Sequence, residues 1–256
     1  MRVIVQYDPA GRLGNRMFQY AYGYILSKKY NCELLCNEPL PNFNIDVTPV
    51  NNINSNIIKT RDFGDQSFCA SHLTNFNGDI VVNSYLQRSE YYVDHREDLR
   101  KLFGIKELDM INQDSLVLHI RETDYKQIGV FLGYSFYKKI IDHYNFKEVK
   151  IVTDNPYSEC VKQLVSDGCQ LLSNTAVTQF MTHGDKNAMA DFKTLLYSEN
   201  VSISQSSFSW WAAFLGYHKK IIFPYKKDLS WWKVEPNEDD IDLYFDIPEV
   251  VDKFII

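Results

Sequence analysis

The sequence has few cysteines, no long apolar run and no excess of positive charge, and each of these absences excludes a class of protein. Its five cysteines in 256 residues have neither the spacing of a disulfide framework nor that of a zinc finger. We therefore expect reduced, mostly buried thiols. No run approaches the roughly 18 apolar residues that a membrane span needs. The formal net charge of −6 argues against a dedicated nucleic-acid-binding protein.

Common nucleotide and metal signatures are also absent. The glycine turn "GRLGN" at residues 11–15 matches neither the dinucleotide fingerprint nor the P-loop, because it lacks the Lys-Ser/Thr ending. By itself this turn indicates only a tight connection between a strand and a helix. No HExxH or EF-hand pattern occurs, and we expect neither a metal nor a cofactor. Hydrophobic residues make up 45% and charged residues 23%, so the chain is globular rather than disordered.

Strands and helices alternate along most of the chain. The short β-branched segment 2–7 predicts a buried strand, and it is followed by a helix over 15–30 and a strand over 32–36. Residues 37–78, rich in Asn, Pro and Ser, predict an irregular region, and Ser89 is a candidate N-cap for the next helix. A second alternation follows the polar segment 106–115. Its predicted strands are 116–121, 150–154, 169–173, 200–204 and 220–224, and its helices include 134–145, 187–199 and 207–217.

This alternation predicts an α/β fold with a parallel sheet in each half of the chain. We expect two Rossmann-like domains, residues 1–110 and 111–256, whose sheets face each other across a cleft. In such sheets, ligands bind beyond the carboxyl ends of the strands. The polar motifs described next all follow predicted strands, so they are expected at those edges.

The stretch "HIRETDY" places His119 and Arg121 on one face at the end of a predicted strand. A guanidinium there can grip phosphate oxygens with a fixed fork of donors, and Glu122 and Asp124 can orient it. The alternative is a structural ion pair between arginine and aspartate, which is common at strand ends. The pattern leaves both interpretations open.

Three further stretches have two interpretations each. In "SISQSSFSWW", Ser206 and Ser207 begin a helix whose N-terminus can bind an anion, or they only cap that helix. We expect Trp210 and Trp211 to be core residues. Asp191, expected near the start of a helix, either complements the helix dipole or accepts the two N–H donors of a guanine edge. Asp154, before Pro156, is interpreted as a turn residue.

Together these motifs resemble those of the bacterial α-1,2-fucosyltransferases, glycosyltransferase family 11. "GRLGNRMFQYA" is similar to that family's G-x-G-N-Q-M-F-Q-Y-A, "HIRETDY" to its His-x-Arg-Arg-x-Asp-Tyr, and "QSSFSWW" to its N-S-S-F-S-W-W, in the same order over about residues 1–225. The resemblance implies a GT-B-like fold. It also implies transfer of L-fucose from GDP-β-L-fucose, with inversion and without an obligatory metal, to a galactose O2 or another sugar hydroxyl.

The resemblance also implies roles for single residues. Arg121 would bind the β-phosphate, His119 and Asp124 would lie at the donor, and Asp191 would hold guanine. The remaining donor-binding residues that it implies are Ser206, Ser207 and Phe208 in the serine turn, with Arg12 and Asn15 in the N-terminal loop.

Two of the departures from the family pattern change the charge. Arg16 replaces a glutamine, and Glu122 replaces the second arginine, so a carboxylate is expected in or beside the site, with a possible change of donor, linkage or acceptor. Asp8 is our hypothesis for the base that deprotonates the acceptor. The rival interpretations are a transferase for another nucleotide sugar, a nucleotide-sugar or glycan-binding protein without turnover, and a structural α/β protein. The expected partners are a GDP-sugar and an oligosaccharide or glycolipid. The expected location is cytoplasmic, with at most peripheral contact at the inner face of a membrane.

Overall fold

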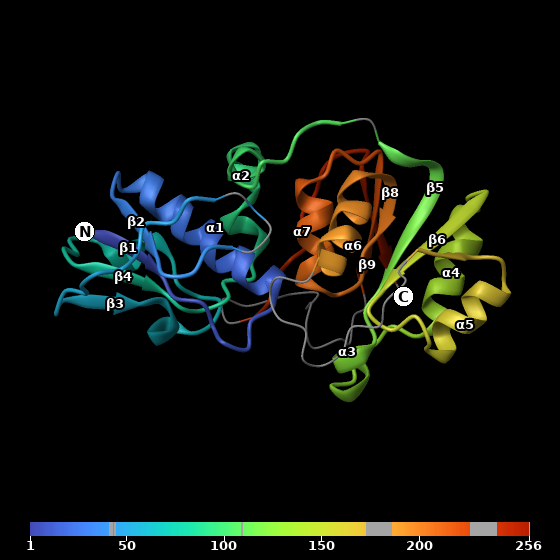
Figure 1. Cartoon of the computed structure of the whole chain (residues 1–256), viewed down its shortest axis with the longest axis horizontal. Coiled ribbons are helices and arrows are strands. Elements are labelled where there is room, and N and C mark those ends of the chain that lie inside the picture. The colour runs from blue at the N-terminus through green and yellow to red at the C-terminus, as the bar shows by residue number, and fades with distance from the viewer. Residues whose placement is uncertain (41–42, 44, 109, 173–185, 226–239, 256) are drawn as a thin grey trace. The chain divides into compact units, whose positions relative to one another are not determined.

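The computed structural model describes residues 1–255, apart from 41–42, 44, 109, 173–185 and 226–239, and these residues form two α/β units (Figure 1). Of these described residues, those within 1–105 and 240–244 belong to unit 1. Those within 106–225 and 245–255 belong to unit 2. The first division falls close to the predicted boundary at residue 110. Residues 240–244, which the predicted domains assign to the C-terminal half, belong to unit 1.

Unit 1 is built on a four-stranded parallel sheet of order β2-β1-β4-β3. In the central strand β1, Val3 is fully buried and lies opposite Leu34 on one side and Ile80 on the other. A run of buried β-branched residues is typical of a parallel strand that is covered on both faces. The strands are β1 (Arg2–Val5), β2 (Glu33–Cys36), β3 (Ile57–Lys59) and β4 (Asp79–Val82).

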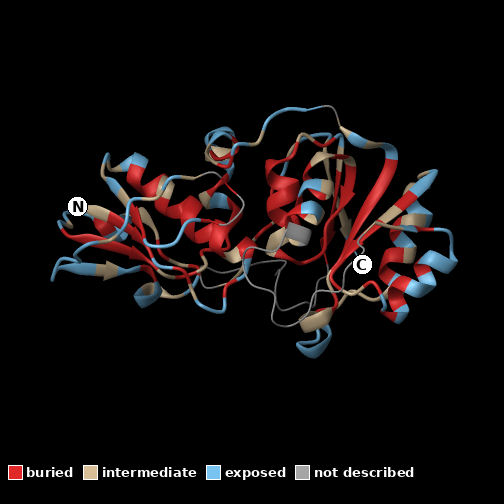
Figure 2. Ribbon diagram, viewed as in Figure 1, coloured by how far each residue is buried: buried red, intermediate tan, exposed pale blue. Residues whose placement is uncertain are grey.

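Helix α1 (Leu13–Lys29) packs closely on this sheet, and its buried face is red in Figure 2. A Cβ atom on Gly23 would lie 2.6 Å from Cγ2 of Val5, so the glycine permits the close approach of helix and strand. Met17 and Phe18 of the same helix are fully buried. Helix α1 confirms the helix predicted over 15–30. The helix was predictable because its apolar residues recur at helical spacing.

Two predictions for unit 1 are wrong in part. The region 37–78 is not wholly irregular, since it contains β3 and the 3-10 turns η1 (Thr60–Phe63) and η2 (Ala70–Leu73). The segment after Ser89 begins with the 3-10 turns η3 (Ser89–Tyr91) and η4 (Val93–His95), and the α-helix is only α2 (Arg96–Leu102). The Ser89 hydroxyl donates to the carbonyl of Tyr244 instead of capping a helix.

Residues 240–244 are tied to unit 1 by hydrogen bonds from backbone groups and from side chains. The Ser89 N–H donates to the carbonyl of Asp242 at 2.7 Å, and the Asp242 N–H donates to the carbonyl of Gln87 at 3.1 Å. The Arg88 guanidinium donates to the carbonyl of Asp240 at 3.1 Å. Leu243 is buried beside them. Unit 1 is therefore assembled from both ends of the chain.

Unit 2 contains a six-stranded sheet of order β10-β9-β8-β5-β6-β7, in which every pair is parallel. Five of its strands overlap predicted ones, although β5 begins five residues before the predicted strand 116–121. The edge strand β10 was not predicted, because its burial is only partial and its alternation is weak. The strands are β5 (Ile111–Ile120), β6 (Glu148–Thr153), β7 (Gln170–Leu171), β8 (Ser198–Ser202), β9 (Lys220–Tyr225) and β10 (Val251–Ile255).

The helices of unit 2 cover both faces of this sheet (Figure 1). One core cluster joins Leu118 of β5 with Tyr137 of α4 and Leu164 of α5, all fully buried. In α7, Trp210 and Trp211 are fully buried, which confirms that they are core residues. The helices are α3 (Thr123–Gln127), α4 (Tyr134–Tyr144), α5 (Glu159–Ser166), α6 (Lys186–Tyr197) and α7 (Ser207–Leu215). Among the helices that the structure describes, none has the length and apolar character to cross a membrane.

Candidate functional site

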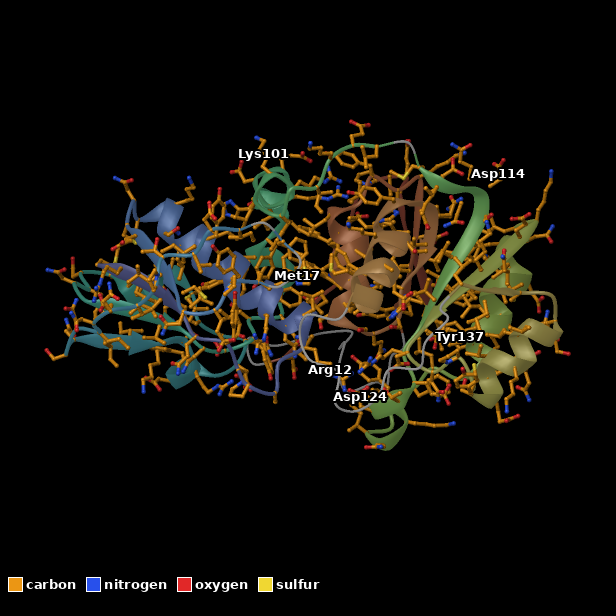
Figure 3. All side chains as sticks on the ribbon, in the orientation of Figure 1. Arg12, Met17, Lys101, Asp114, Asp124 and Tyr137 are labelled. Carbon is orange, nitrogen blue, oxygen red and sulfur yellow. The ribbon has the colours of Figure 1, made fainter. Side chains whose placement is uncertain are left out.

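Three neighbouring strands of unit 2 bring the predicted motifs to one edge of the sheet. Strand β5 lies between β6 and β8. Arg121 follows β5, Asp154 follows β6, and the serine turn 204–207 follows β8. Because all three strands are parallel, their carboxyl ends meet, and the predicted placement of these motifs is confirmed. Short helix α3, which was not predicted, follows at the same edge and carries Asp124 (Figure 3).

Arg121 is held between two carboxylates. Its Nη2 lies 2.7 Å from Oδ1 of Asp124, and its Nη1 lies 2.8 Å from Oδ2 of Asp154. The guanidinium also lies over the ring of Tyr125, 5.6 Å from its centroid. The two carboxylates differ in exposure, since 41% of the Asp124 side chain is exposed but only 4% of that of Asp154. The structural ion pair between arginine and aspartate, one of the two interpretations that the sequence allowed, is therefore present.

Asp154 fixes the backbone that follows β5. Its Oδ1 accepts the N–H of Glu122 at 2.9 Å, and its Oδ2 accepts the hydroxyl of Thr123 at 2.5 Å. The interpretation of Asp154 as a plain turn residue is wrong, because the side chain is the buried anchor of Arg121. Its position at the end of a predicted strand was a usable signal, since the carboxyl ends of parallel strands share an edge.

His119 is buried at the same edge. Its Nδ1 lies 2.8 Å from the hydroxyl of Ser204, and its ring lies 5.7 Å from that of Phe208. Burial lowers the pKa of His119 to about 4, with the charge of Asp154 acting weakly in the opposite direction. The imidazole is consequently neutral near pH 7, and it can donate or accept a hydrogen bond without adding charge.

The buried imidazole predicts a loss of stability in mild acid. The unfolded chain takes up a proton at the ordinary histidine pKa of 6.5, whereas the folded chain does so only near 4. The free energy of unfolding is therefore expected to fall as the pH is lowered from about 6.5 to about 4. Urea unfolding at a series of pH values measures this fall. His119→Asn should flatten the profile in that window, and an unchanged slope in this variant would contradict the assignment.

The serine turn leads into α7. Ser206 occupies the N-cap position, but its side chain does not accept a hydrogen bond from the first turn, so simple capping does not account for it. Tyr125 donates its hydroxyl to the carbonyl of Gln205 at 2.9 Å. The Gln205 side chain is buried, and within the described residues neither of its polar atoms has a hydrogen-bond partner. Sequence reasoning missed Gln205, Tyr125 and Ser204. A buried polar group without a partner indicates a place for water or a ligand group.

Glu122 is buried beside α5. Its Oε1 accepts from Nζ of Lys126 at 2.8 Å, and its charge adds to burial in raising the pKa of the Cys160 thiol to about 12. Residues 121 and 122 are neighbours at the end of one strand, and their side chains have different surroundings. The structure therefore gives Glu122 an ion pair with Lys126 rather than one with Arg121.

Asp191 is not at the start of its helix. It is the sixth residue of α6, so the first of its two interpretations, an interaction with the helix dipole, is wrong. The side chain is half-buried, and the next residue, Phe192, lies 5.4 Å from the ring of Phe208. Asp191 thus lies next in sequence to the aromatic contact that links α6 with the serine turn.

In unit 1, the N-terminal motif forms a rigid turn. Arg12 is the exposed N-cap residue of α1 (Figure 3), and Asn15 accepts a hydrogen bond from the side chain of Gln87 at 2.8 Å. Arg16, which replaces the family's glutamine, is buried. It donates to the carbonyl of Gly11 at 3.2 Å and pairs with Glu38 at 2.9 Å. Arg16 therefore stabilises the turn from inside.

Asp8 follows β1 and is paired with Arg61, whose Nη2 lies 2.8 Å from its Oδ2. The hydrogen bond from Arg61 lowers the pKa of Asp8 below its ordinary value, and the N–H of Ala10 adds to the effect. Asp8 is consequently held ionised and oriented, and it is a weaker base than an unpaired aspartate.

Known proteins are similar to this chain in sequence and in fold. No family model matches the chain. In sequence, it is 23% identical over 252 residues to an α-1,2-colitosyltransferase of Escherichia coli, covering 80% of this chain and 85% of that protein. In structure, it resembles the fucosyltransferase NodZ from Bradyrhizobium, with a TM-score of 0.54 and 12% identity over 86% of this chain and 94% of that one.

A variant of Arabidopsis thaliana FUT1 in complex with GDP is a second structural neighbour. Its TM-score is 0.50, with 14% identity over 91% of this chain and 71% of that one. The fold is that of the fucosyltransferases. The GT-B-like α/β fold with parallel sheets that the motifs implied is thereby confirmed, and the chain is similar to glycosyltransferases in sequence as well as in structure.

Proposed function

We propose that the protein is an inverting, metal-independent glycosyltransferase that transfers L-fucose from GDP-β-L-fucose to a sugar hydroxyl, in the simplest case O2 of a galactose. The observation that carries the proposal is Arg121, anchored by buried Asp154 at the edge where the serine turn begins α7. A guanidinium beside a helix N-terminus is a site for a diphosphate. NodZ soaked with GDP-fucose and FUT1 with GDP support a GDP-sugar as the donor.

Arg121 would stabilise the charge that develops on the leaving GDP. Donors that are already oriented act on such charge at little reorganisation cost. Asp154 would keep its contact with Arg121, because it is buried and also holds the backbone after β5. The more exposed Asp124 would yield its place to a phosphate oxygen. The N–H groups at the start of α7, with Ser206, Ser207 and Phe208, would complete the phosphate site.

The remaining donor contacts follow the family resemblance. Neutral His119 would hydrogen-bond the donor, Asp191 would hold guanine, and Arg12 and Asn15 would face the sugar and pyrophosphate. In the transfer, the acceptor oxygen would form the new bond to C1 as the bond from C1 to phosphate breaks. Asp8 is the proposed acceptor of the hydroxyl proton, and its weak basicity suits a late proton transfer. An oligosaccharide or glycolipid acceptor and a cytoplasmic location with peripheral membrane contact complete the proposal.

A nucleotide titration tests this proposal. Selective thermal stabilisation by GDP over UDP and CMP is expected, unchanged by EDTA, followed by turnover of GDP-fucose. Stabilisation must grow with ligand concentration if the nucleotide binds the folded state. Preference for UDP would overturn the fucosyl assignment. Binding of GDP without transfer or donor hydrolysis would instead identify a binding protein.

A second donor is favoured by one observation, the similarity to the colitosyltransferase. Colitose is the 3-deoxy form of L-fucose, so the two GDP-sugars differ by one hydroxyl group. A donor panel containing both separates the candidates. A site that hydrogen-bonds the 3-hydroxyl should discriminate strongly against the deoxy sugar, whereas an apolar site should discriminate weakly.

A further inference from the structure

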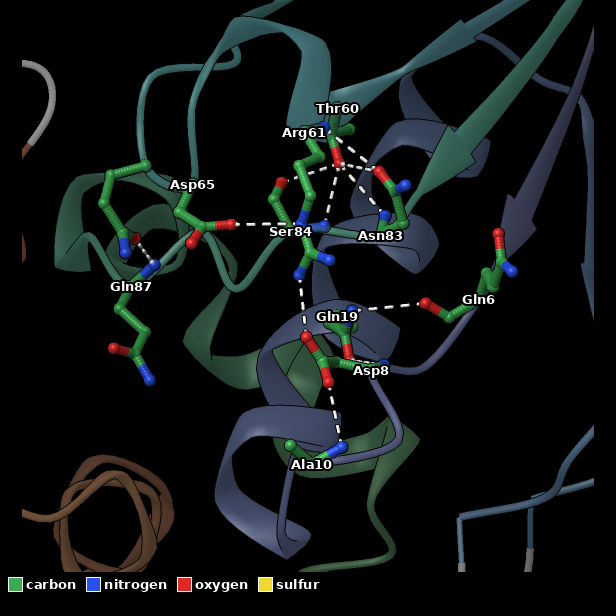
Figure 4. A network of polar contacts seen from close by, with 11 residues as sticks. Gln6, Asp8, Ala10, Gln19, Thr60, Arg61, Asp65, Asn83, Ser84 and Gln87 are labelled. Carbon is green, nitrogen blue, oxygen red and sulfur yellow. Dashed lines mark hydrogen bonds and ion pairs between the residues drawn. The ribbon is translucent and has the colours of Figure 1, made fainter.

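A second polar cluster lies at the carboxyl edge of the sheet in unit 1. Adjacent strands β1, β4 and β3 are followed by Asp8, by residues 83–85 and by residues 60–61, respectively. Figure 4 shows how these loops are joined. Of the residues to which the proposed function gives a role, Asp8 alone lies in this cluster.

The base of the cluster is rigid and buried. The Thr60 hydroxyl accepts the N–H of Asn83 at 3.0 Å and the hydroxyl of Ser84 at 2.6 Å (Figure 4). Asn83 in turn accepts the N–H of Arg61 at 3.0 Å. Thr60 and Ser84 are fully buried, so these bonds fix where Arg61 leaves the backbone.

The groups above this base are open to ligands. The Arg61 side chain is 46% exposed and that of Asp8 17%. The Asp8 carboxylate accepts from Arg61 at 2.8 Å and from the N–H of Ala10 at 2.9 Å, and the nearby Tyr85 hydroxyl adds to the lowering of its pKa. A carboxylate has about four acceptor positions and a guanidinium five N–H donors, so both retain capacity for a ligand. Tyr85 is half-buried and adds a ring beside them.

The charge of the cluster indicates the kind of ligand. Arg61 contacts Asp8 at 2.8 Å and Asp65 at 3.4 Å, so one positive charge lies between two negative ones. A carboxylate or phosphate ligand would meet a net negative charge. Two adjacent hydroxyl groups of a neutral sugar fit instead, because one donates to Asp8 while the other accepts from Arg61.

We propose that Asp8, Arg61 and Tyr85 form an acceptor subsite for an uncharged sugar that presents two adjacent hydroxyl groups. The inference rests on the proposed function for its place in the reaction, since it assigns the acceptor of that transfer. Arg61 and Tyr85 bind and orient the sugar, and Asp8 contacts the hydroxyl that attacks the donor.

Binding of methyl glycosides tests the subsite without the donor. Saturation-transfer NMR with the methyl glycosides of galactose, mannose and glucuronic acid is expected to show binding of a neutral sugar and not of the uronate. Arg61→Ala should lose this signal, and Arg61→Lys should weaken it. Asp62→Asn, which changes an exposed charge at the next position, is the matched control and should bind as the wild type does. Binding of the uronate as strongly as the neutral sugars, or of no neutral sugar, would overturn the proposal.

Kinetics separate this inference from the proposed function. Arg61→Ala is expected to raise the KM for the acceptor about 10-fold to 100-fold, as lost hydrogen bonds to a charged group do. Affinity for GDP should change less than about two-fold, because Arg61 is not among the proposed donor contacts. An unchanged acceptor KM in a variant that melts like the wild type would overturn the subsite. A wild type that neither binds GDP nor hydrolyses a GDP-sugar would refute the proposed function, and the NMR result would still decide on the subsite.

Discussion

Replacing Arg121 with lysine is expected to lower kcat/KM for the GDP-sugar by about 100-fold or more, because one ammonium cannot reproduce the fork that holds a phosphate. The lysine keeps the charge, so Asp154 is not left as a buried unpaired carboxylate. The fall should appear mainly in kcat if the interaction strengthens as the bond to phosphate breaks. Steady-state kinetics with saturating acceptor measure both parameters.

A matched control separates this effect from the loss of an ordinary ion pair. Arg100 is buried and paired with Glu97 in α2, so Arg100→Lys carries the structural cost of the same substitution. It should leave kcat/KM within about three-fold of the wild type, since it lies outside the proposed site. If Arg121→Lys retained full transfer while melting earlier, Arg121 would be only the structural partner of Asp154 and Asp124.

Trp210→Ala is expected to lower the free energy of unfolding of unit 2 by about 3 to 5 kcal/mol, the usual cost of deleting a fully buried aromatic side chain. The ring of Trp210 stacks on that of Phe214 at 4.6 Å and meets Phe245 edge-on at 5.6 Å. Deleting it leaves a cavity in the core that supports α7. Denaturant unfolding followed by circular dichroism measures the change.

Two comparison variants define what this result means. Trp210→Phe keeps a stacked ring, so it should lose less than half as much stability as Trp210→Ala. Tyr157→Ala removes an aromatic side chain that is 70% exposed and should change stability by no more than about 0.5 kcal/mol. A loss below about 1 kcal/mol for Trp210→Ala would show that the ring does not support the core as its burial indicates.

The regular elements of the fold were predictable because burial repeats at the period of each element. Helix α1 and the central strands of both sheets follow from apolar spacing alone. Strands β3 and β10 did not, since they lie at sheet edges and contain no fully buried residue. The turns after Ser89 differ from prediction because Ser89 bonds to a segment more than 150 residues away, which local pattern cannot reveal.

The candidate site was predictable as a set of motifs but not as a set of contacts. Parallel strands bring Arg121 and the serine turn to the same edge of the sheet, and the parallel direction follows from the alternation of strands and helices. The pairing of Arg121 with Asp154 depends on which strands are neighbours, and the sequence did not specify this. The burial of Glu122 beside Lys126 and the exposure of Arg61 likewise depend on tertiary structure, which local sequence patterns do not specify.

The assembly of unit 1 from both ends of the chain has a consequence for how the protein is made. Residues 1–105 leave the ribosome first, but residues 240–244, which bond to Gln87, Arg88 and Ser89, are synthesised about 135 residues later. At about 5 to 20 residues per second, that delay is roughly 7 to 30 s. Until residues 240–244 are synthesised, the carbonyl of Gln87 and the N–H of Ser89 lack the hydrogen bonds that they make to Asp242. The protein therefore cannot mature strictly from its N-terminus, and its first unit is completed only when nearly all of the second has been synthesised.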